Sequence, residues 1–274
     1  MSEFLLELYS EEIPSQLQIS ARNQLKQHFE RFIVNAGIKY KDCIEYSSPT
    51  RLSIYVKGLP ENIKIKSSET RGPKVGVDKN ILEGFIKSRN VSEKDLFIKE
   101  IDKGKFYFLK NKEKIFSVED FLIDILPKAI SSINWKKSMK WSSNDLIWGR
   151  PLRSIFAIFN GKKLSFNYQH IDSVDSITIE QDLVIKSKKI KNSKEYFSIL
   201  KDNKIIIDQH ERKNIILKKF KSISKSKNFK DKYNQNLLEE VVNIVEDPNV
   251  LFVNFDKKYL KLTKEIIIST LEKH

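Results

Sequence analysis

The dipeptide Asn160-Gly161 constrains the fold of this chain more than any other short feature. The run Ile155–Phe159 before it is apolar, and every second residue from Leu164 to Tyr168 after it is apolar. Asn-Gly accepts the positive φ angles of a type I′ turn, and a period of two is typical of a half-buried strand. The sequence therefore predicts an antiparallel hairpin around this turn.

Strands and helices follow one another through the rest of the chain. Phe4–Tyr9 is typical of a buried strand, and Ser10-Glu-Glu-Ile-Pro14 is typical of a turn into a helix that Ser10 caps and Gly37 ends. Further helices are expected over residues 80–87, 117–133, 209–226 and 237–245, from residue 193, and from residue 263 with Ile266, Ile267 and Leu271 facing inward. Further strands are expected over residues 43–46, 52–56, 204–207 and 250–253, with a hairpin over 97–109 and a polar loop over 60–78.

These patterns predict an α+β fold of several small mixed sheet-and-helix units, in which antiparallel hairpins pack with helices. We expect an N-terminal α+β region over residues 1–169 and a Lys-rich helix and strand region over residues 170–274. The strand over residues 52–56 is expected to be half buried, because apolar and polar residues alternate along it.

The chain is strongly basic. Its formal net charge is +14 over 274 residues, and residues 186–232 hold sixteen Lys and Arg against five Asp and Glu. This excess favours a polyanionic partner, above all a nucleic acid. Two alternatives stay open at this point, a solvated helical face with extended lysines and the lysine-rich usage of an AT-rich genome.

Several classes of chemistry lack support in the sequence. The single cysteine, Cys43, excludes an intrachain disulfide framework and fits a reducing compartment. The four histidines are too scattered for a metal site, and phosphate-loop, dinucleotide, zinc-helix and nucleophile-elbow motifs are missing. No apolar run approaches the length of a membrane helix, and Glu3 and Glu7 flank the first one, unlike a signal peptide, so we expect a cytoplasmic protein.

All three tryptophans lie between Asn134 and Pro151, interleaved with cations. The segment is either a packing hub or a surface for an anionic partner, since Trp can stack an unpaired base and Arg can grip a phosphate. We favour Trp135 and Trp141 as anchors in the core or at a subunit interface, with the neighbouring lysines facing outward.

Eight phrases of the sequence, taken in order, resemble the β subunit of bacterial heterotetrameric glycyl-tRNA synthetase. The first ends in Glu-Glu-Ile-Pro, the second resembles the family's Thr-Pro-Arg-Arg-Leu, and a later one resembles its Pro-Lys-Ser-Met-Arg-Trp. The phrases are Leu5–Pro14, Ser48–Leu52, Arg71–Pro73, Glu83–Phe85, Trp135–Trp141, Gly149–Arg153, Leu238–Val242 and Leu271–His274. Their colinear order across nearly the whole chain carries the resemblance.

The resemblance implies a subunit of glycine-tRNA ligase that is not catalytic alone. In this family the α subunit holds ATP, glycine and magnesium, and the β subunit is needed for charging of tRNA-Gly, in an α2β2 assembly. We therefore expect no catalytic residue, no metal and no cofactor in this chain, with ATP and Mg at the α subunit. The candidates for binding tRNA or the α subunit are Arg51, Arg71, Lys136, Lys137, Lys140, Arg150 and Arg153. An internal brace is the alternative for each of these arginines.

Two departures from the family pattern keep other functions open. The Gly-His-Arg-Phe phrase that usually follows the Asn-Gly hairpin is missing at Thr178–Leu183. Family members are also much longer, with a hydrolase-like helical domain and an anticodon-binding domain that follow, so we expect a split, truncated or trimmed N-terminal portion. A general RNA-binding module and a truncated, non-functional remnant therefore remain as alternatives.

Overall fold

The computed structural model describes residues 2–65, 68–101, 104–111, 114–140, 145–181, 184–230 and 232–273. Backbone contacts group the chain into unit 1, residues 1–60 with 122–274, and unit 2, residues 61–121. The boundary expected after residue 169 falls inside unit 1, between strands β13 (Asn167–Tyr168) and β14 (Ile171–Val174), which pair antiparallel. The mixture of helices with small, mostly antiparallel sheets confirms the α+β class.

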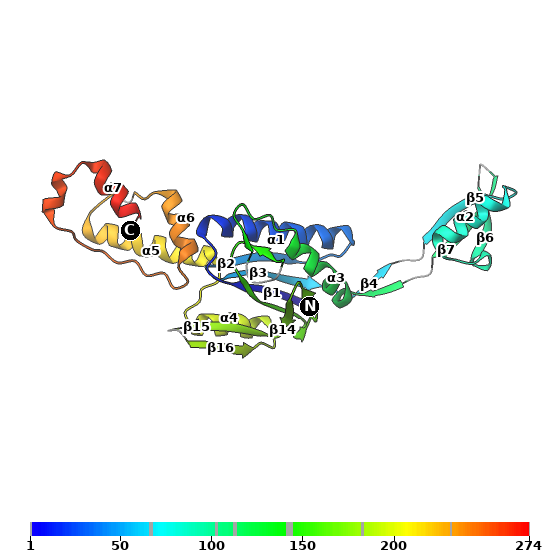
Figure 1. Ribbon diagram of the computed structural model, residues 1–274, viewed down its shortest axis with the longest axis horizontal. Coiled ribbons are helices and arrows are strands. Elements are labelled where there is room, and N and C mark those ends of the chain that lie inside the picture. The colour runs from blue at the N-terminus through cyan, green and yellow to red at the C-terminus, as the bar shows by residue number, and fades with distance from the viewer. Residues whose placement is uncertain are drawn as a thin grey trace. The chain divides into compact units, whose positions relative to one another are not determined.

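The centre of unit 1 is a seven-stranded sheet built around β1 (Ser2–Ser10) (Figure 1). β1 pairs antiparallel with β11 (Leu152–Phe159) on one side and with β3 (Arg51–Leu59) on the other. β2 (Asp42–Ser48) pairs with the far edge of β3, and β14 pairs parallel with β11. The apolar run that predicted the first strand is therefore the middle of the sheet, where both neighbours satisfy its backbone.

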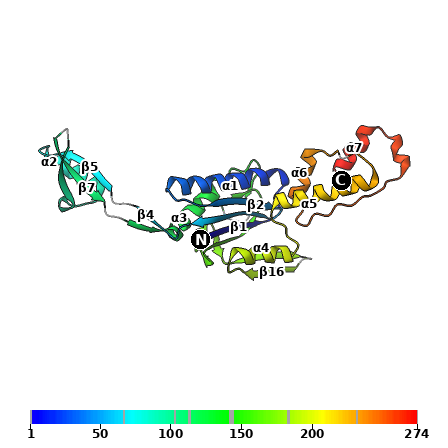
Figure 2. The ribbon, with the colours of Figure 1, turned by 180° about the vertical axis from the view of Figure 1, so that it is seen from behind.

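Helices cover both faces of this sheet. α1 (Ser15–Asn35) lies on one face, where Phe29 stacks on Phe4 with ring centroids 5.2 Å apart. α4 (Ser193–Asp202) and the pair β15 (Ser176–Gln181) and β16 (Val184–Lys189) lie on the other, as Figures 1 and 2 show from opposite sides. The expectation of a half-buried strand over residues 52–56 is therefore wrong, because α4 buries the alternate residues Ser53 and Tyr55 as well.

The predicted Asn160-Gly161 turn is confirmed, since both residues have positive φ angles of 50° and 75°. Its second strand is shorter than expected. β12 covers only Lys162–Lys163, and the chain then leaves β11, because Ser173 of β14 exchanges hydrogen bonds with the Phe166 backbone instead. The start of α1 also differs from expectation. Its N-cap is Pro14, and the Ser10 hydroxyl donates to the Glu11 carbonyl rather than capping the helix.

Unit 2 contains two small sheets and one helix. β4 (Asn62–Ile65) pairs with β8 (Lys114–Ser117), and β5 (Ser68–Lys74), β7 (Gly104–Asn111) and β6 (Leu96–Ile101) form a three-stranded sheet beside α2 (Lys79–Arg89) and the short η1 (Glu93–Asp95). The polar loop expected over residues 60–78 is thus wrong. β4 has only four residues and β5 is mostly polar, so pairing with partners later in the chain, such as Thr70 with Leu109, is needed to reveal them. The expected β6–β7 hairpin is confirmed, although Asp102 and Lys103 of its turn lie outside the described residues.

The helix α3 (Val118–Ser131) includes Pro127 and leads back to unit 1. Near the C-terminus, α5 (Gln209–Lys227), α6 (Gln235–Ile244) and α7 (Lys264–Lys273) confirm three expected helices, with the short η2 (Lys257–Lys261) before the last. The strands expected over 204–207 and 250–253 are wrong: neither segment pairs with another strand. Ile205 and Ile207 are buried in a loop, whereas Leu251 and Val253 are more than 70% exposed. The expected inward face of α7 is wrong for Ile266 and Leu271, which are at least half exposed, whereas Ile267 is partly buried.

One buried arginine joins the Lys-rich helix to the sheet. The Arg212 guanidinium donates to the carbonyl oxygens of Ile207, Val242 and Ser47 at 3.0, 2.9 and 2.8 Å. Burial lowers the pKa of Arg212 to about 10. Because α5, α6 and β2 meet on this side chain, the first turns of α5 are held against β2 at the edge of the sheet. None of the helices in the described part of the chain is long and apolar enough to cross a membrane.

Candidate functional site

Four segments of unit 1 form most of the lining of one cleft of about 1030 Å³. They are the β1–α1 junction, the β2–β3 turn, the segment around Arg150, and the end of α6 with the residues after it, and Met139 and Glu180 of β15 complete the lining. The lining residues are Tyr9, Ser10, Glu11, Glu12, Ile13, Pro14, Ser15, Pro49, Thr50, Arg51, Met139, Arg150, Pro151, Arg153, Glu180, Asn243, Ile244 and Glu246. Backbone hydrogen bonds tie the first three segments together, because Glu11 N–H donates to the Pro151 carbonyl and Ile13 N–H to the Pro49 carbonyl, at 2.9 and 2.7 Å.

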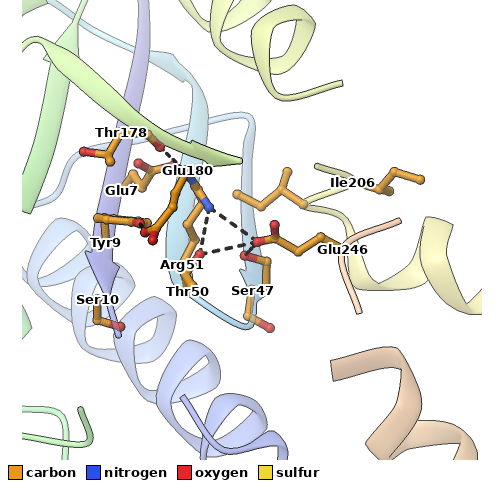
Figure 3. Close-up of polar contacts among 12 residues, drawn as sticks. Glu7, Tyr9, Ser10, Ser47, Thr50, Arg51, Thr178, Glu180, Ile206 and Glu246 are labelled. Atoms are coloured by element: carbon orange, nitrogen blue, oxygen red, sulfur yellow. Dashed lines mark hydrogen bonds and ion pairs between the residues drawn. The ribbon is translucent and has the colours of Figure 1, made fainter. Parts of the chain in front are cut away.

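Arg51 is one of the residues that line the cleft, and Figure 3 shows its polar contacts. Its Nε lies 3.2 Å from Oε2 of Glu7, and its Nη1 lies 3.4 Å from Oε1 of Glu246. The other guanidinium contacts are the Thr50 hydroxyl at 2.8 Å, the Thr178 carbonyl, and the Tyr9 ring at 4.8 Å. Arg51 is only 2% exposed, so its charge is fully engaged inside the protein.

The carboxylate of Glu7 lies beneath Arg51 and is completely buried. Its Oε2 also accepts a hydrogen bond from the Tyr196 hydroxyl at 2.7 Å, which brings α4 to the centre of β1. Burial raises the pKa of Glu7, while the Arg51 charge and the Tyr196 hydrogen bond act in the opposite direction. A buried carboxylate of this kind is tolerated because it is paired and hydrogen-bonded.

The rim of the cleft is not basic. The cleft lining holds four carboxylates and three arginines, namely Glu11, Glu12, Glu180, Glu246, Arg51, Arg150 and Arg153. Arg51 already pairs with carboxylates inside the protein. Arg153 is also paired, with Glu11 through a hydrogen bond of 2.9 Å and with Glu180 at 3.8 Å. Phosphate groups bind best where cations lack a protein partner. The cleft therefore fits a protein surface of mixed or positive charge better than a phosphate backbone. The described residues contain no cluster of His, Cys, Asp and Glu that could hold a metal ion.

Comparison with known proteins assigns the family. A family model described as "Glycyl-tRNA synthetase beta subunit" matches residues 4–274. The chain belongs to this family. Glycine-tRNA ligase beta subunits from Dictyoglomus turgidum, Clostridioides difficile and Rickettsia typhi are 33%, 32% and 33% identical to it. The alignments cover 98%, 100% and 100% of this chain but 40%, 41% and 41% of those relatives. The chain thus spans about 40% of the length of the curated relatives it matches, as a homologue of the N-terminal portion.

Four of the eight phrases that carry the family resemblance converge in space. Glu-Glu-Ile-Pro, Pro-Thr-Arg, the Met139 phrase and Arg150-Pro-Leu-Arg153 all reach the cleft. Two further phrases of the glycyl-tRNA synthetase beta subunit family meet in unit 2. A Cβ at Gly72 would lie 3.0 Å from the Phe85 ring, so the Arg-Gly-Pro phrase packs directly on the Gly-Phe phrase of α2. The sequence identified these phrases without indicating which of them come together.

The candidate arginines differ in their surroundings. Arg51 is buried, which favours the internal-brace alternative for this residue. Arg71 lies in unit 2, exposed, with its guanidinium 3.7 Å from the Phe106 ring centroid. Arg150 is half-buried and donates to the Gly149 carbonyl at 2.9 Å, and it makes no ion pair with any described residue. Arg150 is therefore the cleft cation that is most available to a partner.

The candidate lysines lie outside the cleft lining. Lys136 and Lys137 are exposed and form no ion pair within the described ranges. Lys140 is exposed in the short strand β9 (Met139–Lys140) and pairs with Asp145 at 2.5 Å. Such a pair between exposed side chains is weak, so an anion can compete for Lys140.

The tryptophan segment is a packing hub at two of its three rings. Trp148, in β10 (Ile147–Trp148), is 1% exposed, and its ring centroid lies 4.9 Å from that of Trp135 and 6.3 Å from that of Tyr168. A Cβ at Gly149 would lie 2.4 Å from the Trp135 ring, so only glycine allows this approach. The interpretation of Trp135 as an anchor is supported. Trp141 lies outside the described residues, and Trp148 is the buried anchor that sequence reasoning missed.

Sequence reasoning also missed the acidic side of the site. Glu7, Glu180, Tyr196 and Glu246 are distant in sequence, and they come together through the packing of β15, α4 and the end of α6 against the sheet. One signal was present. Glu7 is a charged residue inside the apolar run of a buried strand, and a charge there requires a buried partner.

Proposed function

We propose that this chain acts as the N-terminal part of the β subunit of a glycine-tRNA ligase. In this role it supports ATP-dependent charging of tRNA-Gly in the cytoplasm by binding the α subunit and tRNA within an α2β2 assembly. ATP and Mg belong to the α subunit in this proposal, and the chain itself holds no cofactor. The observation that carries the proposal is the family match over residues 4–274, joined by the convergence of the family phrases on one cleft.

The two partners fit two different surfaces in this proposal. The α subunit fits the cleft, because its rim offers carboxylates, Arg150, which pairs with none of the described acidic residues, and the apolar side chains of Met139 and Ile244, which are 40% and 56% exposed. The tRNA fits the exposed lysines, because its phosphates need cations that lack a protein partner. Lys136 and Lys137 meet that condition, as do several lysines along α5.

Complex formation tests the proposal. The chain is mixed with the α subunit from the same genome and with tRNA-Gly, and each complex is measured by co-elution and by titration. We expect a complex with the α subunit that Arg150→Glu weakens at least about tenfold, since a charge reversal in a contact region costs more than about 1.4 kcal/mol. Arg89→Glu is the matched control, an exposed arginine of α2 in unit 2.

Other outcomes favour the alternatives. Equal affinity for tRNA-Gly and unrelated RNAs, with no α-subunit complex, would indicate the general RNA-binding module that the positive charge alone suggests. Absence of both complexes would indicate a non-functional remnant. If Arg150→Glu and Arg89→Glu changed the affinity for the α subunit equally, the cleft would not be the binding site of the α subunit.

A further inference from the structure

The C-terminal end of α5 carries a cluster of exposed aromatic rings. Phe229 and Phe252 stack with centroids 6.2 Å apart and an interplanar angle of 22°. Phe220 packs edge-on against Phe229 at 6.1 Å and against Tyr233 at 5.8 Å. Phe229, Tyr233 and Phe252 are nevertheless 39%, 46% and 45% exposed. We call these four residues the aromatic platform.

The backbone fixes the position of the platform. Asn228 ends α5 with a φ of 52°, and the N–H groups of Asn228 and Phe229 donate to the carbonyls of Lys225 and Ser224 at 3.4 and 3.2 Å. This is the Schellman pattern of a helix end, which turns the residue after the left-handed position back over the helix. Phe229 is thereby held against Phe220.

Lysines surround the platform. A hollow of about 590 Å³ beside Phe229 is lined by Lys221, Ser224, Lys225 and Asn228. The Lys227 ammonium lies 5.1 Å from the centroid of the Phe252 ring. Lys221, Lys225 and Lys227 are exposed, and no ion pair joins them to the rest of the described chain. Cations and partly exposed aromatic rings are therefore presented together.

We propose that the aromatic platform binds unpaired nucleotides of RNA, with a base stacked on Phe252 or Tyr233 and the adjoining phosphates on Lys221 and Lys225. The proposal rests on the proposed function and adds to it where the tRNA is held and which part of it is recognised. An unpaired nucleotide offers a flat apolar base and a phosphate within a few ångströms of each other. The aromatic platform can stack the base, and the lysine ammonium groups around it can bind the phosphate. A purely apolar protein partner would leave those ammonium groups buried without anions.

Direct RNA binding tests this proposal without the α subunit. The full chain is titrated with a single-stranded RNA of about ten nucleotides that carries 2-aminopurine, and with a duplex of equal phosphate number. We expect tighter binding of the single strand, and quenching of the 2-aminopurine as it stacks. Phe252→Ala should weaken single-strand binding at least about fivefold and leave duplex binding unchanged, whereas Phe252→Tyr should retain it. Phe252 lies outside the helices and strands, so its replacement spares the core.

A charge-matched pair of variants separates the site from general electrostatics. Lys221→Gln with Lys225→Gln should weaken single-strand binding more than Lys186→Gln with Lys188→Gln, two exposed lysines of β16. The proposal is overturned if the two pairs act equally, if Phe252→Ala leaves the affinity within about twofold, or if single strand and duplex bind alike. Co-elution with the α subunit would survive each of these results, so a failure here is distinct from a failure of the proposed function.

Discussion

Nε of Arg51 lies 3.2 Å from Oε2 of Glu7, and both residues are at most 2% exposed. The pair joins two neighbouring strands, because Glu7 is on β1 and Arg51 begins β3. Arg51 then extends to Glu246 beyond α6 and to the Thr178 carbonyl of β15. One side chain thus connects the sheet to both elements that frame the cleft, and its first role is to hold those elements in place.

Removal of Arg51 should therefore destabilise unit 1 strongly. Arg51→Met leaves the Glu7 carboxylate buried without its cation, which costs about 3–5 kcal/mol of unfolding free energy. The cost should shrink at acidic pH, since protonation of Glu7 removes the unpaired charge. Urea unfolding followed by tryptophan emission measures both effects. Arg153→Met, which breaks an exposed pair with Glu11, should cost no more than about 1 kcal/mol. Equal costs for the two variants would mean that Arg51 is not a brace.

Tyr9 should make stability fall at alkaline pH. Burial and the hydrogen bond to Glu180 raise the pKa of Tyr9 from 10.0 to about 12. The folded protein therefore holds the phenol proton more tightly than the unfolded chain, so the stabilisation is complete below pH 10 and is lost as the pH rises through about 12. Between these values the unfolding free energy of the wild type should fall more steeply than that of Tyr9→Phe. Tyr40 and Tyr46 contribute equally to both proteins, and parallel curves would contradict the prediction.

Gly149 should be intolerant of any side chain. Gly149→Ala places a methyl group 2.4 Å from the Trp135 ring, and the resulting overpacking should cost about 1–3 kcal/mol. Its control is Gly84→Ala in α2, where a Cβ meets nothing within 4 Å and alanine is the better helix former. That variant should leave unit 2 as stable as before or more stable, by up to about 1 kcal/mol. Denaturant midpoints of both variants provide the comparison, and a neutral Gly149→Ala would show that the Trp135 ring does not lie against Gly149 in solution.

Lys136 and Lys137 should contribute to tRNA binding through phosphate contacts. Their joint replacement with Gln should weaken tRNA affinity and lower the slope of log K against log salt by roughly 1–2, since each neutralised phosphate releases counterions. Adding Lys140→Gln should extend the effect. Lys162 and Lys163 of β12 are an exposed lysine pair that serves as the control. An unchanged salt slope would show that the lysines of the tryptophan segment are solvent-exposed and do not contact the phosphates of tRNA.

The fold was predictable where local signals and tertiary packing agree. Apolar periodicity, proline and glycine predict β1, α1, α5 and the Asn160-Gly161 turn, because the apolar pattern coincides with the buried face. The sequence could not reveal β5, whose partners lie elsewhere in the chain and whose residues are mostly polar. It also suggested strands at residues 204–207 and 250–253. These predictions failed because short apolar runs occur in buried loops and in exposed segments as well as in strands.

The candidate site was predictable in its parts but not in its assembly. Family resemblance drew attention to Arg51, Arg150 and Arg153. Only the structure shows that Arg51 is a buried brace, that Arg153 is paired at the rim, and that Arg150 has no ion pair among the described residues. The difference depends on Glu7, Glu11 and Glu246, which sheet register and the end of α6 bring to those arginines. Local sequence signals only that Glu7 needs a buried partner, and it does not indicate which residue that partner is.

Glycine charging tests the central claim most directly. The initial rate of glycyl-tRNA formation is measured with the α subunit from the same genome, ATP, Mg and tRNA-Gly, while this chain is added stepwise. If the chain is the N-terminal part of a working β subunit, the rate should rise and saturate with added wild-type chain, and the rise should weaken with Arg150→Glu but not with Arg89→Glu. A charging rate that stays at the level of the α subunit alone at every concentration of the chain would contradict the account.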